Sequence, residues 1–247
     1  ALIFLARTPY VLRNPRGRAA WGATGVGALG LLTLGSVVPQ PVLDGALGGS
    51  NLINLVQNVC ATVAFWLMLR ASTDDLPERP LLARPAALLV VVVAFTVPFL
   101  LVEERGGTDF HFIVREIEQT PMWLYGTVYM VGVGLIAATT LRRGVLQSPV
   151  ALVVFRVGLA LVVVASVDEV VSLTADHFGL FPAGVRGGLR LAFDPPFYLG
   201  IVLIVVAMAS LTFRRWARDL RHRGPHRRLR REGRLGLQHA WRQGQRH

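Results

Sequence analysis

The sequence contains no lysine, a single cysteine and few charged residues. All 26 basic residues are arginine, and Cys60 has no second cysteine with which to form an intrachain disulfide. Charged residues make up 17% of the chain, whereas soluble domains carry about 25%. Hydrophobic residues make up 53%, and the mean hydropathy is +0.49. This composition argues against an ordinary soluble domain.

The signatures of common enzymes and cofactor proteins are also absent from the sequence. There is no phosphate-binding glycine loop, no His-Glu-x-x-His, no Cys-x-x-Cys and no Gly-x-Ser-x-Gly. The apolar segments contain no histidine, which argues against a haem held by two histidines. Glu103 and Glu104 resemble the paired glutamates of intramembrane proteases, but the partner histidines of those enzymes are missing. We therefore expect no cofactor and no metal, and an enzyme is the least favoured function.

The hydrophobic residues are gathered in blocks of roughly 18–22 residues, the length at which a helix crosses the hydrocarbon core of a bilayer. The blocks do not alternate polar and apolar residues, as transmembrane strands do. We predict an all-α, polytopic transmembrane helical bundle over residues 1–213 and a basic tail over residues 214–247. The six predicted spans are about 20–38, 52–69, 85–102, 121–141, 149–171 and 195–213. The short apolar stretch at residues 1–6 suggests a seventh span in the native protein.

Polar residues placed just before the apolar blocks predict where several helices begin. Thr120-Pro121, Ser148-Pro149 and Asp194-Pro195 each put a capping side chain before a proline. Proline suits the first helical position because its missing N–H would be unpaired there. We expect Asn51 to cap the second span in the same way.

The distribution of arginine predicts the orientation of the chain in the membrane. If the predicted loops alternate sides, 21 arginines fall on the side of residues 7–18 and of the tail, and 4 fall on the opposite side. Because arginine is enriched in cytoplasmic loops, the arginine-rich side is expected to be cytoplasmic. We therefore expect a multi-pass protein of a bacterial cell (cytoplasmic) membrane with a cytoplasmic C-terminus.

Two features predict partners. The tail carries twelve arginines, each of which contributes about 1 kcal/mol near an anionic leaflet. We expect it to bind anionic lipid headgroups; nucleic acid is less favoured, because arginine richness alone does not specify it. Ala19, Ala23 and Gly27 form a stripe of small residues in the first span. Such a stripe allows close packing of helices within the bundle or, alternatively, in a homodimer.

The second predicted span carries four polar residues. Asn54, Asn58 and Thr62 lie on one helical face, and Gln57 lies beside them. Amides are costly in hydrocarbon unless they are paired, so this face is expected to point into the bundle or into a wet cavity. Hydrogen bonding between helices is one interpretation, and a solute pathway is the other.

The fifth predicted span carries three charged residues. Arg156 lies about 10 Å from the start of the span, within reach of the inner headgroups. Asp168 and Glu169 lie near the outer end. They either mark an early end of the helix at the interface or form an ion or proton site, since charges inside spans are generally functional.

The outer loop, residues 103–120, repeats apolar residues at helical spacing, which predicts a short helix at the membrane surface. Asp109, His111, Asp176 and His177 share this side of the membrane, but their spacing does not indicate a metal site. Inside the third span, Pro98 removes a backbone hydrogen bond, which predicts a kink.

Two stretches, 12–16 (Leu-Arg-Asn-Pro-Arg) and 51–55 (Asn-Leu-Ile-Asn-Leu), resemble an uncharacterised actinobacterial family of polytopic membrane proteins described as transporters. The chain departs from that pattern at Asn58, where the family pattern has a histidine, and in its short basic tail. The resemblance implies a polytopic bundle and a small-solute or ion transporter-like function. A membrane sensor or scaffold that acts through the tail is the alternative.

Overall fold

The computed structural model describes residues 4–5, 8, 11, 17–33, 38–103, 105–106, 112–146, 148–182 and 184–210. All regular elements in those residues are helices, which confirms the all-α prediction for the described part of the chain. The tail and most of the N-terminal stub lie outside it. The predictions of a seventh span and of the tail's role therefore stay predictions.

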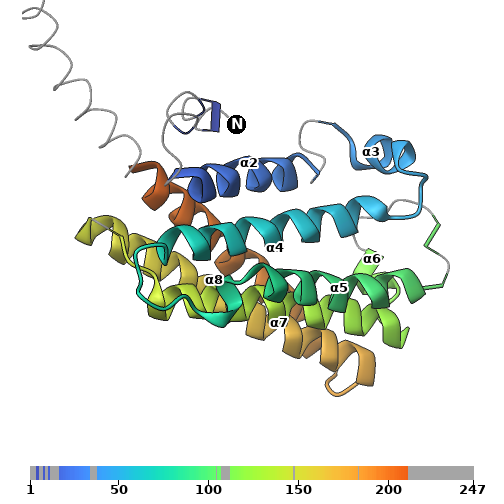
Figure 1. Cartoon of the computed structure of the whole chain (residues 1–247). Coiled ribbons are helices and arrows are strands. Elements are labelled where there is room, and N and C mark those ends of the chain that lie inside the picture. Colours follow the sequence, from blue (N-terminus) through green and yellow to red (C-terminus); the bar gives the residue numbers. More distant parts are fainter. Residues whose placement is uncertain are drawn as a thin grey trace, which may run out of the picture.

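Four helices are long and apolar enough to cross a membrane. They are α4 (Leu52–Ser72), α7 (Thr120–Arg143), α8 (Pro149–Phe178) and Gly184–Ser210, which is unlabelled in Figure 1 and is here named the last helix. They contain 21, 24, 30 and 27 residues. At 1.5 Å per residue they measure roughly 32–45 Å, enough to cross a hydrocarbon core of about 30 Å.

Two further helices stand where the first and third spans are predicted. They are α2 (Arg18–Leu32) with 15 residues and α5 (Pro85–Leu101) with 17. Their lengths correspond to roughly 22 and 26 Å, less than the hydrocarbon core. The prediction of six complete spans is therefore not confirmed. Short elements lie in the connections: α3 (Gln40–Ala46), η2 (Leu81–Ala83) and α6 (Phe112–Arg115), the last within the predicted outer-loop helix.

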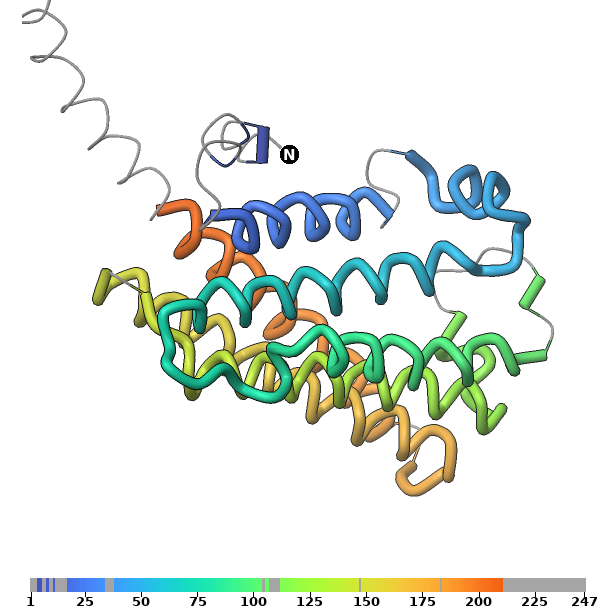
Figure 2. The backbone as a smooth tube through the Cα atoms, viewed as in Figure 1, coloured from blue at the N-terminus to red at the C-terminus, as the bar shows by residue number. Residues whose placement is uncertain are grey.

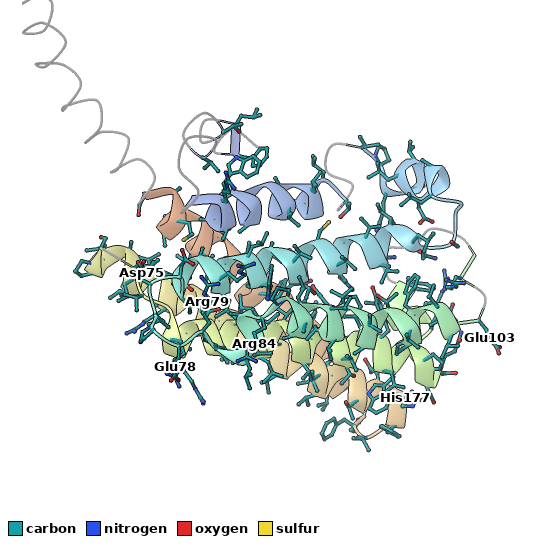
Figure 3. All side chains as sticks on the ribbon, viewed as in Figure 1. Asp75, Glu78, Arg79, Arg84, Glu103 and His177 are labelled. Carbon is teal, nitrogen blue, oxygen red and sulfur yellow. The ribbon has the colours of Figure 1, made fainter. Side chains whose placement is uncertain are left out.

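The long helices run up and down and lie side by side (Figures 1 and 2). Helix α7 packs against α4, α5 and α8, and α2 packs along α4. This alternation gathers the basic loops at one end: Arg79 and Arg84 lie there, whereas Glu103 and His177 lie at the other (Figure 3). The arrangement agrees with the loop alternation on which the predicted orientation depends.

Aromatic side chains fill the centre of the bundle between α5 and α7. Phe95, Phe99 and Tyr125 are fully buried, and Tyr129 is nearly so. The ring centroid of Phe95 lies 6.1 Å from that of Tyr125 and 5.7 Å from that of Tyr129, and both contacts are edge-to-face. Such pairs are stabilising beyond the area that they bury. Pro98 lies inside α5, which continues past it to Leu101.

The outward faces of the helices are apolar. Large side chains are more than half exposed on α5 and α8, such as Leu89 at 64%, Val153 at 62% and Val164 at 61%, and Leu191 of the last helix is 78% exposed. Monomeric soluble proteins rarely expose continuous apolar surface of this extent. Hydrocarbon surroundings account for it, which supports the membrane assignment.

The predicted start of α8 is confirmed, and that of α7 is wrong. Ser148 caps α8: its Oγ accepts a hydrogen bond from the N–H of Ala151 at 3.5 Å, and Pro149 is the first helical residue. Thr120 is itself the first residue of α7, and Gln119 precedes it without a side-chain cap. Pro121 therefore occupies the second helical position, which tolerates the missing N–H equally well.

The last helix begins earlier than predicted. It starts at Gly184 and runs through Asp194 and Pro195, so this pair does not cap it. Helix α8 likewise continues past its predicted end at residue 171 to Phe178, where Gly179 adopts a left-handed conformation with φ 61°. In these added parts, Asp176 of α8 forms salt bridges with Arg186 and Arg190 of the last helix.

Asp44 of α3, instead of the predicted Asn51, caps α4. Its carboxylate accepts hydrogen bonds from the N–H groups of Asn51 at 3.0 Å and Ile53 at 3.1 Å. Asn51 adopts a left-handed conformation with φ 56°, and its Nδ2 donates to the carbonyl of Arg105 at 2.9 Å. The local sequence favours asparagine as the cap, but a buried carboxylate from the preceding helix takes its place.

We expect Asp44→Ala to lower the free energy of unfolding by about 1–2 kcal/mol, as loss of a helix cap does. The substitution leaves the N–H groups of Asn51 and Ile53 without their carboxylate acceptor. Unfolding in detergent, followed by circular dichroism during titration with sodium dodecyl sulfate, measures the change. The exposed Asp75 is the matched control, and Asp75→Ala is expected to leave stability unchanged. Equal stability of both variants would contradict the capping role.

Candidate functional site

The polar residues of α4 do not form one continuous surface. Asn58 is buried, and its Nδ2 donates to the hydroxyl of Tyr125 on α7 at 2.7 Å. Thr62 is fully buried, and its Oγ1 donates to the carbonyl of Asn58 at 2.8 Å. Both residues are satisfied inside the bundle. The bond from Asn58 joins α4 to α7, as the interpretation of hydrogen bonding between helices predicts, whereas the bond from Thr62 lies within α4.

Asn54 and Gln57 lie elsewhere on α4. Asn54 belongs to the junction with α3: its Nδ2 donates to Oδ1 of Asn51, and its Oδ1 accepts from Nε2 of Gln40, both at 3.3 Å. The side-chain oxygen Oε1 of Gln57 is buried without a hydrogen-bond partner among the described residues. Gln57 also lines a cavity. Of the four predicted residues, it is the one left available to a ligand.

Arg156 lies on the outward face of α8 and is exposed. If α8 is centred on the bilayer, Arg156 lies about 11 Å from the midplane, inside a hydrocarbon half-thickness of about 15 Å. Its long side chain then reaches the headgroups, as snorkelling arginines do. The structure does not bring Arg156 together with the other candidates.

Asp168 and Glu169 lie within α8, which continues beyond both of them. The interpretation that they mark an early end of the helix is therefore wrong. The Oδ2 atom of Asp168 is buried without a hydrogen-bond partner among the described residues. Glu169 interacts electrostatically with Asp194 and Arg190 of the last helix. No described residue forms a hydrogen bond or salt bridge with Glu169, although it is half-buried.

A salt-bridge cluster closes the interface between α8 and the last helix at the C-terminal end of α8. The Nε of Arg190 donates to Oδ2 of Asp176 at 2.7 Å, and Nη1 of Arg186 lies 3.7 Å from Oδ1 of the same carboxylate. Sequence reasoning missed this cluster because it placed Asp176 in a loop. Arg186 and Arg190 follow soon after the apolar segment of α8 in the sequence, and this order could have indicated an antiparallel helix pair.

His177 has a structural role next to this cluster. Its ring stacks on Trp123 of α7 with centroids 5.1 Å apart, and its Nδ1 lies 2.8 Å from the carbonyl oxygen of Ile117. Asp109 and His111 lie outside the described residues. Among the residues that the structure places, no group of three potential metal ligands is found.

Helices α8 and the last helix approach each other most closely at two glycines. A Cβ added to Gly158 would lie 2.7 Å from the carbonyl oxygen of Gly200, and one added to Gly200 would lie equally close to the carbonyl oxygen of Gly158. Close backbone contact of this kind is typical of small residues in membrane helices. The contact sets the spacing of the two helices that carry Glu169 and Arg190.

A cavity of about 260 Å³ lies between α2, α4 and the last helix. Figure 2 shows the orange end of the last helix next to α2. Its walls are mostly small or apolar, and its polar lining comes from Thr24, Gln57, Tyr129 and Tyr198. Ala23 and Gly27 of the predicted small-residue stripe line it, and Gly27 also packs against Ala64 of α4. Ala23 and Gly27 therefore face other helices of the same chain, and the alternative of a homodimer stays a prediction.

Glu169 and Asp194 do not line the cavity, and they act on its tyrosines only electrostatically. Tyr129 lines the cavity and interacts electrostatically with both Glu169 and Tyr198. Tyr198 in turn interacts with Asp194 of its own helix.

Comparisons with known proteins add no relative to this picture. No protein-family model, no curated protein and no solved structure matches the chain. The resemblance to a transporter family stays a prediction from the sequence pattern.

We expect Asn58→Leu and Tyr125→Phe each to lower the free energy of unfolding by roughly 0.5–2 kcal/mol. The double variant should lose less than the sum of the two, because the hydrogen bond between them is removed only once. Titration with sodium dodecyl sulfate in mixed micelles measures all three variants. Thr139 bonds only within α7, to the carbonyl of Leu135, so Asn58→Leu combined with Thr139→Ala is the additive control. Additivity of Asn58→Leu with Tyr125→Phe would contradict the bond.

Proposed function

We propose that the chain is a small-solute or ion transporter-like protein of a bacterial cytoplasmic membrane. Glu169 carries the proposal: a carboxyl group on a membrane-spanning helix has no hydrogen-bond or salt-bridge partner among the described residues. If α8 is centred on the bilayer, Glu169 lies about 8 Å from the midplane, well inside the hydrocarbon half-thickness of about 15 Å. An ionisable group at that depth costs free energy, and such residues usually serve a pathway.

The surroundings of Glu169 support a pathway over a purely structural role. By the same arithmetic Asp176 lies about 19 Å from the midplane, at the outer interface. Its salt bridges to Arg186 and Arg190 satisfy it there. Glu169 has no such partner, although Arg190 is near enough to interact with it. A carboxyl left unpaired beside a satisfied one is available to an ion, a proton or a solute group.

The orientation belongs to the same proposal. The described arginines at the basic end are Arg18, Arg70, Arg79, Arg84, Arg142 and Arg143. We place this end, together with the tail, in the cytoplasm, where the tail would contact anionic headgroups. Glu169 and the Asp176 cluster then face the opposite half of the membrane.

No observation favours the other functions. The sensor or scaffold alternative depends on the tail, which lies outside the described residues. The enzyme alternative depends on Glu103 and Glu104. Glu103 is exposed in a loop, and its backbone N–H and carbonyl form hydrogen bonds with the side chain of Gln119. Glu104 lies outside the described residues.

A pathway predicts that water reaches the face of α8 that carries Glu169. Ser172 and Ala165 lie one turn to either side of Glu169 and are buried between helices in this structure. In a Cys60→Ser background, single cysteines at these positions should react with a membrane-impermeant maleimide if the pathway opens there. The thiolate is the reactive form and needs water to exist. Reaction rates in liposomes are measured by a gel shift and are expected to exceed those of lipid-facing cysteines by at least about tenfold. A rise of one unit in the pKa of a thiol lowers its thiolate fraction by about this factor.

Val164 and Val167 are the matched controls, because both face outward from the same turns of α8 at about 60% exposure. Their cysteine variants should stay unreactive in the bilayer. If Ser172→Cys and Ala165→Cys react no faster than Val164→Cys and Val167→Cys, the pathway proposal is wrong.

A further inference from the structure

We propose that the cavity between α2, α4 and the last helix holds one acyl chain of a phospholipid from the leaflet at the basic end of the bundle. This binding goes beyond the proposed transport. Glu169 does not line the cavity, so a lipid chain there does not require a pathway at Glu169. It requires only that the bundle lies in a bilayer, as the apolar outward faces of its helices indicate.

The walls of the cavity suit hydrocarbon better than water. A buried water molecule needs about 2–4 hydrogen-bond partners. The polar lining comes from Thr24, Gln57, Tyr129 and Tyr198, and the hydroxyl of Thr24 already donates to the carbonyl of Trp21 at 2.7 Å. The cavity volume of about 260 Å³ is several times the roughly 30 Å³ that one water takes. Water filling this space would therefore leave most of its molecules short of partners.

The cavity opens onto the lipid-facing surface of the bundle. Leu31, Tyr198 and Val205 line it and are also 40–49% exposed on the outside of the described helices. An empty space would forfeit the dispersion contacts of the side chains around it. Because hydrocarbon lies directly outside, an acyl chain can enter from there and restore these contacts.

The depth of the cavity matches one leaflet. Along the last helix it is lined by residues from Phe197 to Ala209, whereas residues 184–196 do not line it. If the last helix is centred on the bilayer, Phe197 lies at the midplane and Ala209 about 18 Å from it. The hydrocarbon of one leaflet is about 15 Å thick. The cavity therefore extends from the middle of the membrane to one interface, which is the depth that a single acyl chain occupies.

The charge at that interface suits the phosphate of the same lipid. Ala20 and Ala209 line the cavity at the basic end, which Arg79 and Arg84 mark in Figure 3. Arg18 is exposed at the start of α2, and it precedes Ala20 by about 3 Å along the helix axis. A phospholipid whose chain fills the cavity places its phosphate at about this depth, where arginine is a favourable partner.

Native mass spectrometry of the full-length protein tests this inference. Protein freed of lipid in detergent is titrated with phosphatidylcholine, and the dissociation constant of each successive lipid is measured. We expect the first lipid to bind at least tenfold more tightly than those that follow, because only one chain can enter the cavity. A series of equally weak steps would overturn the inference.

Two competitors separate the chain from the headgroup. Lysophosphatidylcholine has the same headgroup and one acyl chain, and it should displace the first lipid. Glycerophosphocholine has the headgroup without a chain, and it should not displace that lipid at the same concentration. Equal competition by the two compounds would mean that the protein recognises the headgroup alone, which contradicts a site for the chain.

Variants that fill the cavity locate the site. Ala28→Phe and Ala20→Phe place a ring at two depths of the cavity, and each should weaken the first step at least tenfold. Ala94→Phe adds the same ring to the exposed face of α5, outside the cavity, and should retain the tight step. Tight binding by both filled variants would place the lipid elsewhere and refute the inference. If neither variant folds, the competition on the native chain still decides.

The same spectra distinguish a lipid from a second copy of the chain. A monomer with one tightly bound lipid supports the inference. A dimer that forms without lipid and is lost in Ala28→Phe would mean that a second copy covers the cavity, and the inference would be wrong.

Discussion

The hydrocarbon around the bundle is the constraint on which the structure depends. In a medium without water, backbone polar groups are satisfied inside helices, and polar side chains are tolerated only between helices or at their ends. The outward faces obey this rule, with leucine and valine exposed along α5, α8 and the last helix. Every polar group that lies inside the bundle therefore has a cost, and whether a neighbour offsets that cost separates structural groups from candidate functional groups.

Two polar positions illustrate the distinction. Asn58 bonds to Tyr125, and the aromatic cluster of α5 and α7 surrounds that tyrosine, so the pair links α4 to α7 in the core. Glu169 has a similar depth but no such bond. The same rule explains why Asp44 is tolerated: two backbone N–H groups bind its carboxylate. Polar groups with hydrogen-bond partners hold the helices together. Glu169 has no such partner, and a bound ligand would explain its position inside the bundle.

Small residues determine where the bundle is tight and where it is open. Gly158 and Gly200 bring α8 and the last helix into backbone contact. On the other side of the last helix, Ala20, Ala23, Gly27 and Ala28 of α2 have side chains too small to fill the space that faces them. The cavity is the volume that these residues leave. Small residues thus have two effects in this bundle. At Gly158 and Gly200 they bring two helix backbones into contact, and on α2 they leave a cavity.

Composition, hydropathy and arginine placement were enough to predict a helical membrane bundle, because the length of an apolar block and the cost of burying charge are local properties. The sequence also located α4, α7 and most of α8, and it identified Ser148 as a cap. It did not determine helix ends that depend on neighbours. The last helix starts eleven residues before its predicted start at residue 195, and in this added part Arg190 forms a salt bridge with Asp176 of α8.

Only the tertiary structure decided which polar residues are paired. Asn54, Gln57, Asn58 and Thr62 look equivalent in sequence, yet Asn58 meets a tyrosine 67 residues away and Gln57 meets a cavity. The same holds for Asp176 and Glu169, which lie on one face of α8 but differ in whether an arginine of the last helix reaches them. A side chain's partner across a helix interface depends on helix spacing and rotation, and these are set by the packing of the whole bundle.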